Sequence, residues 1–268
     1  MEEILYSFLQ QIFMTIGLIV IFGLLCSLCR NGFVKLLGNA GAVIINRITG
    51  VVGVPIHELS HALFSFIFGH QIVEINLFNP DSEDGTLGSV LCNYNKKNIL
   101  HIIGLFFSGI GPILGGTAVI TLLMVLIVPD VSTALFENIG YNANIFGEID
   151  VFESLLSTIF IIFTEKNFNN IWFWVFLILA LMIASHMELS TPDIKNALPG
   201  GLIIMGIFLV IDVILYLIYQ PALFAFTAGI NYFGSFLFSI LLIGGIFNIC
   251  FLMIAVIIRL IGKILIRE

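Results

Sequence analysis

The sequence predicts an all-α polytopic membrane protein with about six transmembrane helices and a small membrane-associated β-hairpin. Of its 268 residues, 59% are hydrophobic and only 10% are charged, whereas an ordinary soluble domain has about 45–50% and about 25%. Six apolar segments also approach or exceed the roughly 20 residues that a helix needs to cross a hydrocarbon core. These segments are approximately residues 8–29, 44–69, 99–128, 171–189, 201–219 and 233–258.

The distribution of charge bears on the partners of the protein and on its orientation in the membrane. The formal net charge is −7 and there is no basic run, so nothing in the sequence indicates a nucleic-acid partner. We expect a single domain over residues 1–268, embedded in the lipid bilayer as a multi-pass protein. Arg259, Lys263 and Arg267 follow the last apolar segment, and because basic residues are enriched on the cytoplasmic side, they favour cytoplasmic termini.

The first three apolar segments differ in character. The first follows Met-Glu-Glu, with no positively charged region before it and no small-residue cleavage site after it, so we expect a retained span. The second contains the polar motif described below. The third is long enough to tilt or bend, and small residues in its first half predict close helix packing: Gly104, Gly109, Gly111, Gly115 and Gly116, together with Pro112.

Three stretches between the apolar segments have other patterns. Residues 70–98 alternate apolar and polar side chains on both sides of the turn sequence NPDSEDG, which predicts a β-hairpin. Residues 186–200 form a polar break between two apolar segments. Within 129–170, apolar residues recur at helical spacing and predict an amphipathic helix along the membrane interface: Phe152, Leu155, Leu156, Ile159, Phe160 and Phe163.

The second apolar segment contains the motif H-E-x-x-H at His57, Glu58 and His61. In a helix the two histidines are four residues apart, so both imidazoles project from one face and can bind a single Zn²⁺. Glu58 lies about 100° around the helix from His57, where it can reach a water molecule at the metal. Chance produces this motif in only about four of a thousand chains of this composition, and ionisable residues in a membrane span are usually functional.

A catalytic zinc usually has three protein ligands and one open position, so a third ligand must come from elsewhere. The 186–200 break offers His186, Glu188 and Asp193. Asp193 follows Ser-Thr-Pro, a sequence that ends one helix and begins another, and irregular backbone at membrane depth occurs where it lines a wet cavity. From spacing alone, a ligand and an exposed residue at a helix start explain Asp193 almost equally well.

The order of these features resembles the site-2 protease family of intramembrane zinc metalloproteases, and most closely its compact bacterial members without a PDZ domain. The similarity covers roughly residues 44–200. It consists of H-E-x-x-H in a membrane segment, a hairpin with GTLGSV at 85–90, Gly111-Pro112 in the next segment, and an aspartate at a later helix break.

By this resemblance His57, His61 and Asp193 hold one zinc ion per chain, and Glu58 is the general base. The resemblance also implies that the protein lies in a bacterial cell membrane. Many relatives carry Asn-x-x-Pro and Leu-Asp-Gly around the third ligand, whereas this chain has STPDIKNALPG. The third ligand therefore stays open between Asp193, Glu188 and His186.

The function implied is hydrolysis of a peptide bond in or near the transmembrane segment of a membrane protein substrate, expected to have a single span. Bound Zn²⁺ lowers the pKa of water from 15.7 to about 7 and polarises the carbonyl group, while Glu58 accepts the water's proton. Two alternatives keep the same residues: an inactive metal-binding scaffold or chaperone, and an ion or metal transporter. A transporter more often spreads such groups over several spans. No feature of the sequence indicates an oligomeric state.

Asp212 is the one charged residue of the fifth apolar segment. Charged residues within a membrane span are rare and usually functional, so Asp212 is a candidate functional residue. The sequence shows no partner for it.

Overall fold

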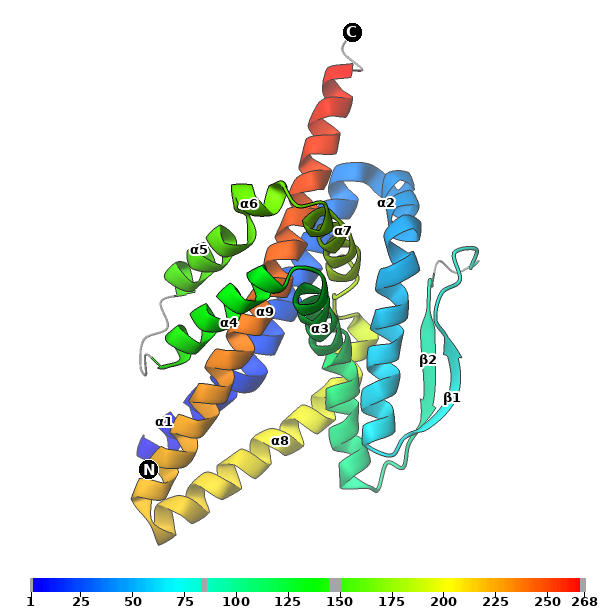
Figure 1. Cartoon of the computed structure of the whole chain (residues 1–268). Helices are drawn as coiled ribbons and strands as arrows, with labels where there is room; N and C mark the ends of the chain where they lie inside the picture. Colours follow the sequence, from blue (N-terminus) through cyan, green and yellow to red (C-terminus); the bar gives the residue numbers. More distant parts are fainter. Residues whose placement is uncertain (1, 83–85, 145–150, 266–268) are drawn as a thin grey trace.

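The computed structural model describes residues 2–82, 86–144 and 151–265 (Figure 1). Within these ranges, four helical stretches are long and apolar enough to cross a membrane, which supports the predicted all-α membrane protein. The first comprises α1 (Glu2–Ile12), the π-helical turn η1 (Phe13–Gly17) and α2 (Leu18–Ile67). The other three are α3 (Ile99–Ile127), α8 (Thr191–Ile218) and most of α9 (Gln220–Leu265).

The first helical stretch contains two of the predicted segments and reverses direction between them. The reversal is visible at the top of α2 in Figure 1. Gly38 lies within α2 but has non-helical torsion angles, with φ at +71°. Glycine adopts a positive φ without steric cost, so this residue permits the reversal between 8–29 and 44–69.

The helices around the polar break differ from the prediction. The helix α7 (Ile171–Ala184) has 14 residues and ends before the predicted limit of 189. The helix α8 begins at Thr191, well before the predicted 201, because Ser190 and Asp193 form a capping box at its N-terminus. Such a box satisfies two of the backbone donors that a helix start leaves unpaired. The break is therefore shorter than predicted.

Within the described residues of 129–170, three helices are present: α4 (Pro129–Asn144), α5 (Val151–Ile162) and α6 (Glu165–Phe168). A helix is present where the apolar spacing predicted one, although the side chains of Phe152 and Leu155 lie outside those described. An exposed salt bridge of 2.9 Å joins Lys166 of α6 to Asp130 of α4. The hydrogen bond from Lys166 lowers the pKa of the Asp130 carboxyl group.

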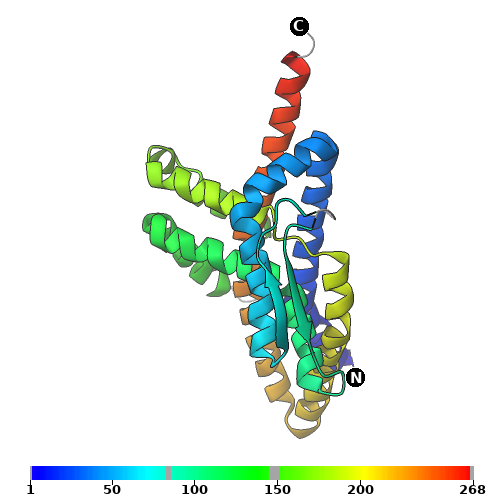
Figure 2. The same cartoon turned by 90° about the vertical axis from the view of Figure 1, so that its right-hand side faces the viewer.

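The predicted hairpin is present. Strand β1 (Gln71–Asn76) pairs antiparallel with β2 (Ser89–Asn93), with Ile75 opposite Val90 and an irregularity between Ile72 and Glu74. The hairpin runs alongside the second half of α2 in both views (Figures 1 and 2). This arrangement places β2 close to the helix that carries the H-E-x-x-H motif.

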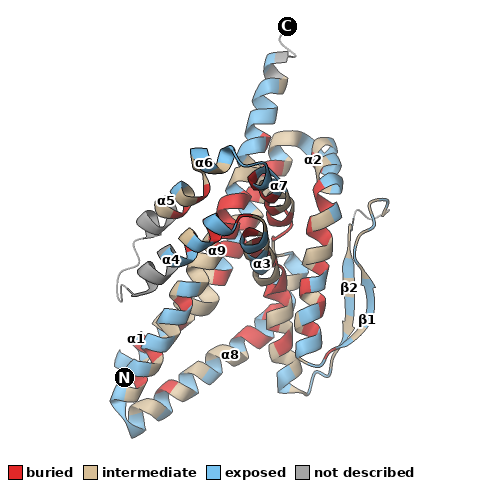
Figure 3. Ribbon diagram, in the orientation of Figure 1, coloured by how far each residue is buried: buried red, intermediate tan, exposed pale blue. Residues whose placement is uncertain are grey.

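Buried residues concentrate where α2, α3, α7 and α9 meet (Figure 3). Glycines of α3 allow its neighbours to approach closely. A Cβ atom on Gly111 would lie 3.0 Å from the Ser60 carbonyl oxygen of α2, and one on Gly109 would lie 2.7 Å from the Asp193 carbonyl oxygen of α8. The predicted role of these small residues is thus seen in the structure. They bring the H-E-x-x-H helix and the start of α8 against opposite sides of α3.

Candidate metal centre

The two histidines of the motif lie side by side on α2, as their spacing predicts. The His57 and His61 Nε2 atoms are 3.1 Å apart. Two ligands held 2.0–2.1 Å from one tetrahedral zinc are separated by about 3.3 Å. The two imidazoles therefore have the separation that one metal ion requires.

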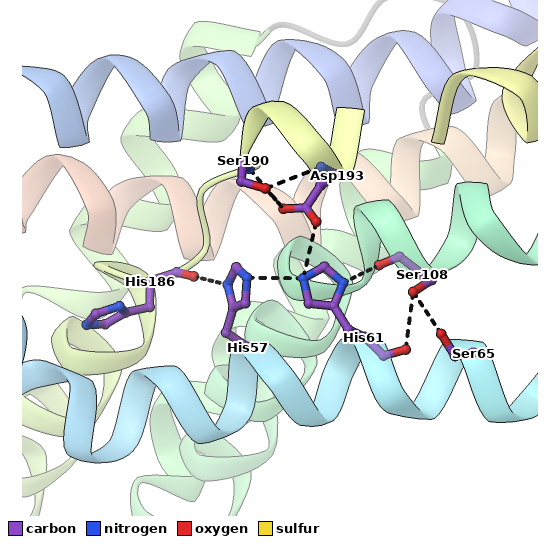
Figure 4. A network of polar contacts seen from close by, with 7 residues as sticks. All are labelled: His57, His61, Ser65, Ser108, His186, Ser190 and Asp193. Carbon is purple, nitrogen blue, oxygen red and sulfur yellow. Dashed lines mark hydrogen bonds and ion pairs between the residues drawn. The ribbon is translucent and has the colours of Figure 1, made fainter. Parts of the chain in front are cut away.

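Asp193 meets these histidines from α8. Its Oδ1 atom lies 3.5 Å from His61 Nε2, and ligand atoms of His57, His61 and Asp193 all lie within 4.8 Å of one another. The Asp193 Oδ2 atom accepts hydrogen bonds from the Ser190 backbone N–H at 2.9 Å and the Ser190 hydroxyl group at 2.5 Å. One oxygen of Asp193 thus caps the helix, and the other faces the histidines (Figure 4).

The Nδ1 atom of each imidazole forms a hydrogen bond with a backbone carbonyl group. His57 Nδ1 donates to the His186 carbonyl oxygen at 2.6 Å, and His61 Nδ1 donates to the Ser108 carbonyl oxygen at 2.7 Å. A carbonyl oxygen only accepts, so both Nδ1 atoms carry the hydrogen. In neutral imidazoles the two Nε2 lone pairs then face each other and a carboxylate oxygen. This convergence of three acceptors fits a metal cation, and the Nδ1 contacts are those that commonly orient zinc-binding histidines.

The two other candidates for a third ligand have different partners. The His186 ring points away from the cluster (Figure 4), and its Nε2 atom lies 3.0 Å from the Thr49 hydroxyl oxygen. Glu188 forms a salt bridge of 3.2 Å with Arg30. Among the described residues, Asp193 alone joins the two histidines in a cluster of this kind. His186 contributes its carbonyl group, a role that no side-chain pattern reveals.

Glu58 lies between two cavities beside the cluster. One, of about 600 Å³, is also lined by His57, His61 and Asp193. The other, of about 410 Å³, is also lined by Arg30 and His57. Glu58 forms no hydrogen bond or ion pair with any described residue, so its carboxyl group is available to a molecule in either cavity.

The hairpin closes one side of these cavities. Residues from Gly88 to Cys92 line the larger cavity. Gly88 packs so closely on α2 that a Cβ atom there would lie 2.6 Å from Val54 Cγ1 and 2.8 Å from Glu58 Cγ. A residue with a side chain at this position would displace either the hairpin or Glu58.

We therefore expect Gly88→Ala to lower the thermal unfolding midpoint, because the added methyl group has to displace the hairpin or the Glu58 side chain. Such overpacking costs about 1–3 kcal/mol. Gly206→Ala is the matched control, since no atom lies within 4 Å of a Cβ built there. Thermal unfolding of both variants checks the prediction; equal midpoints for Gly88→Ala and the wild type would contradict it.

Comparison of the chain with protein-family models, with curated proteins and with solved structures finds no match. The class of site is therefore defined by its geometry: two histidines and one carboxylate converge beside a glutamate in a membrane-protein fold.

Proposed function

We propose that the chain is an intramembrane zinc metalloprotease of the site-2 protease type. The observation that carries the proposal is the convergence of His57 Nε2, His61 Nε2 and Asp193 Oδ1 in a cavity that Glu58 also lines. Two nitrogen ligands and one oxygen ligand form a donor set typical of catalytic zinc, which keeps a fourth position open. Its proposed substrate is a single-span membrane protein.

In this proposal each residue has a separate role. His57, His61 and Asp193 hold the metal ion, and the carbonyl groups of His186 and Ser108 keep the imidazoles oriented. Zn²⁺, when bound, would lower the pKa of a water molecule and polarise the substrate carbonyl group. Glu58 accepts a proton from the attacking water molecule and later gives it to the leaving amine.

The hairpin supports the binding of an extended peptide. The β2 residues Ser89 to Cys92 line the cavity beside the metal ligands. An extended segment can add to the edge of a sheet through backbone hydrogen bonds. We propose that the substrate unwinds and adds to β2, which exposes its peptide bonds to Glu58.

The proposal includes six spans with both termini in the cytoplasm. Five of the predicted segments lie in the four long apolar stretches, and α7 supplies a shorter sixth helix. Reporter fusions test this orientation: one after Glu268 should report the cytoplasm, and one near residue 140 should report the outside. A cytoplasmic signal at 140 would contradict the orientation.

The experiment that tests the function is cleavage of a tagged single-span membrane protein by the full chain in lipid vesicles. Substrates are sought among membrane proteins that accumulate uncut when the gene is inactivated. We expect cleavage by the wild type, loss after zinc chelation and recovery when zinc is restored. Cleavage that persists without metal would contradict a metalloprotease, and failure to cut every accumulating protein would favour an inactive scaffold.

A further inference from the structure

A second buried polar cluster lies far from the metal centre. It is formed by Gln11 of α1, Asp212 of α8 and Thr227 of α9. The helix α8 runs from the metal centre to the region where α1 and α9 lie (Figure 1). Asp212 is 19 residues beyond Asp193, which corresponds to about 28 Å along a helix. The cluster is therefore separate from the proposed protease chemistry.

The cluster is buried although it lies among three apolar helices. Asp212 and Gln11 are 0% exposed, and Thr227 is 6% exposed. In the second half of α8, Asp212 is the one buried residue, while apolar neighbours such as Val210 and Leu217 are exposed. In this part of α8 the Asp212 side chain is therefore buried in the protein, while apolar side chains lie on the surface.

Hydrogen bonds join the three helices at this point. The Gln11 amide nitrogen donates to Asp212 Oδ1 and to the Thr227 hydroxyl oxygen, each at 2.9 Å. The helix widens into η1 two residues after Gln11, and π-helical turns of this kind are frequent at functional sites.

Two buried oxygens of the cluster have no partner. Asp212 Oδ2 and Gln11 Oε1 are both buried without a hydrogen bond to any residue that the structure describes. Both atoms are acceptors when the carboxyl group is ionised, so neither can satisfy the other. An unpaired acceptor at a buried site costs free energy, and a buried carboxylate without a counter-charge costs more.

No positive charge is available to balance Asp212. Residues 2–17 and 201–258, which include all of α1 and the parts of α8 and α9 around the cluster, contain no lysine, arginine or histidine. The other titratable side chains there are acidic or neutral at pH 7: Glu2, Glu3, Tyr6, Tyr216, Tyr219, Tyr232 and Cys250.

We propose that Asp212, Gln11 and Thr227 form an intramembrane proton-binding site in which the Asp212 carboxyl group is protonated at neutral pH. A carboxylic acid and an amide can form a ring of two hydrogen bonds. The bond from the Gln11 amide nitrogen to Asp212 Oδ1 is present. A proton on Asp212 Oδ2 supplies the donor for the second bond, to Gln11 Oε1, and so satisfies both orphan oxygens and removes the charge.

A sodium ion is the other occupant that would balance the charge. A metal cation requires converging oxygen lone pairs, whereas here an amide N–H group lies between Asp212 Oδ1 and the Thr227 hydroxyl oxygen. This arrangement of donors and acceptors therefore favours a proton over a sodium ion. Sodium binding is the alternative outcome of the test.

The test is infrared spectroscopy of the full chain in lipid vesicles at neutral pH, with and without sodium. We expect a carbonyl band of a protonated carboxyl group in both buffers, lost in Asp212→Asn and retained in the control Asp130→Asn, whose carboxylate is exposed and paired with Lys166. Gln11→Leu should shift the band to higher frequency, because Asp212 Oδ1 loses its donor. Identical spectra of the wild type and Asp212→Asn would overturn the proposal, and a band that disappears in sodium would assign a sodium site instead.

Thermal unfolding supplies a second measurement. Asn resembles a protonated Asp in size and charge, so Asp212→Asn should keep the wild-type unfolding midpoint. Asp212→Ala removes the carboxyl oxygen that accepts from the Gln11 amide, so it should lower the midpoint. Failure of Asp212→Asn to fold would also contradict a neutral Asp212, because the variant preserves neutrality and shape.

Discussion

Glu58→Gln should retain about one zinc ion per chain and lose peptide hydrolysis by about 10²–10⁴-fold or more, the usual contribution of a positioned acid–base group. The amide keeps the size of the side chain but cannot accept the proton of the attacking water. The proposed ligands His57, His61 and Asp193 do not depend on Glu58, because their orienting contacts come from His186, Ser108 and Ser190. Activity should therefore fall without a fall in metal content.

The measurement is single-turnover cleavage of the tagged substrate, with zinc analysis of the same protein sample. Glu74→Gln serves as the matched control: it makes the same chemical change at an exposed position of β1, outside the lining of either cavity. Cleavage at the wild-type rate by Glu58→Gln would show that the motif does not act as a protease site, and would favour the scaffold or transport function.

Asp193→Ala should reduce zinc occupancy and cleavage together. The substitution removes the oxygen that lies 3.5 Å from His61 Nε2, and two histidines alone bind zinc more weakly and in poorer geometry. It also removes the capping contacts with Ser190, a loss of about 1 kcal/mol in helix stability. Loss of a cap is small compared with loss of a metal ligand, so unfolding should not be the main effect.

Glu188→Ala is the matched control for this variant, because it removes a carboxylate that pairs with Arg30 and is not part of the cluster. Zinc titration and cleavage of both variants give the comparison. Full zinc content and normal turnover in Asp193→Ala would mean that the third ligand lies elsewhere.

The periodic features of this protein could be predicted from the sequence. The four-residue spacing of His57 and His61 places both imidazoles on one helix face, and the alternation in 70–98 predicts a hairpin; both are observed. The position of Asp193 beside the histidines was harder to predict, because Ser190-x-x-Asp193 forms a capping box at the start of any helix. Only the packing of Gly109 against the Asp193 backbone shows why this cap lies beside the histidines.

Features that depend on contacts between distant segments could not be predicted. The carbonyl groups of His186 and Ser108 orient the imidazoles, and carbonyl groups are the same at every residue. The partners of Asp212 were equally hidden, because Gln11 is 201 positions away in the chain. Such contacts arise from helix packing and leave no local pattern.

Zinc analysis of the purified full chain tests the proposed metal centre most directly. The wild type should carry about one zinc ion per chain, because three protein ligands with one open position form the catalytic pattern. The double variant His57→Ala, His61→Ala should carry almost none, since only Asp193 remains. Unchanged zinc content in the double variant would contradict the metal centre, and with it the protease function that depends on it.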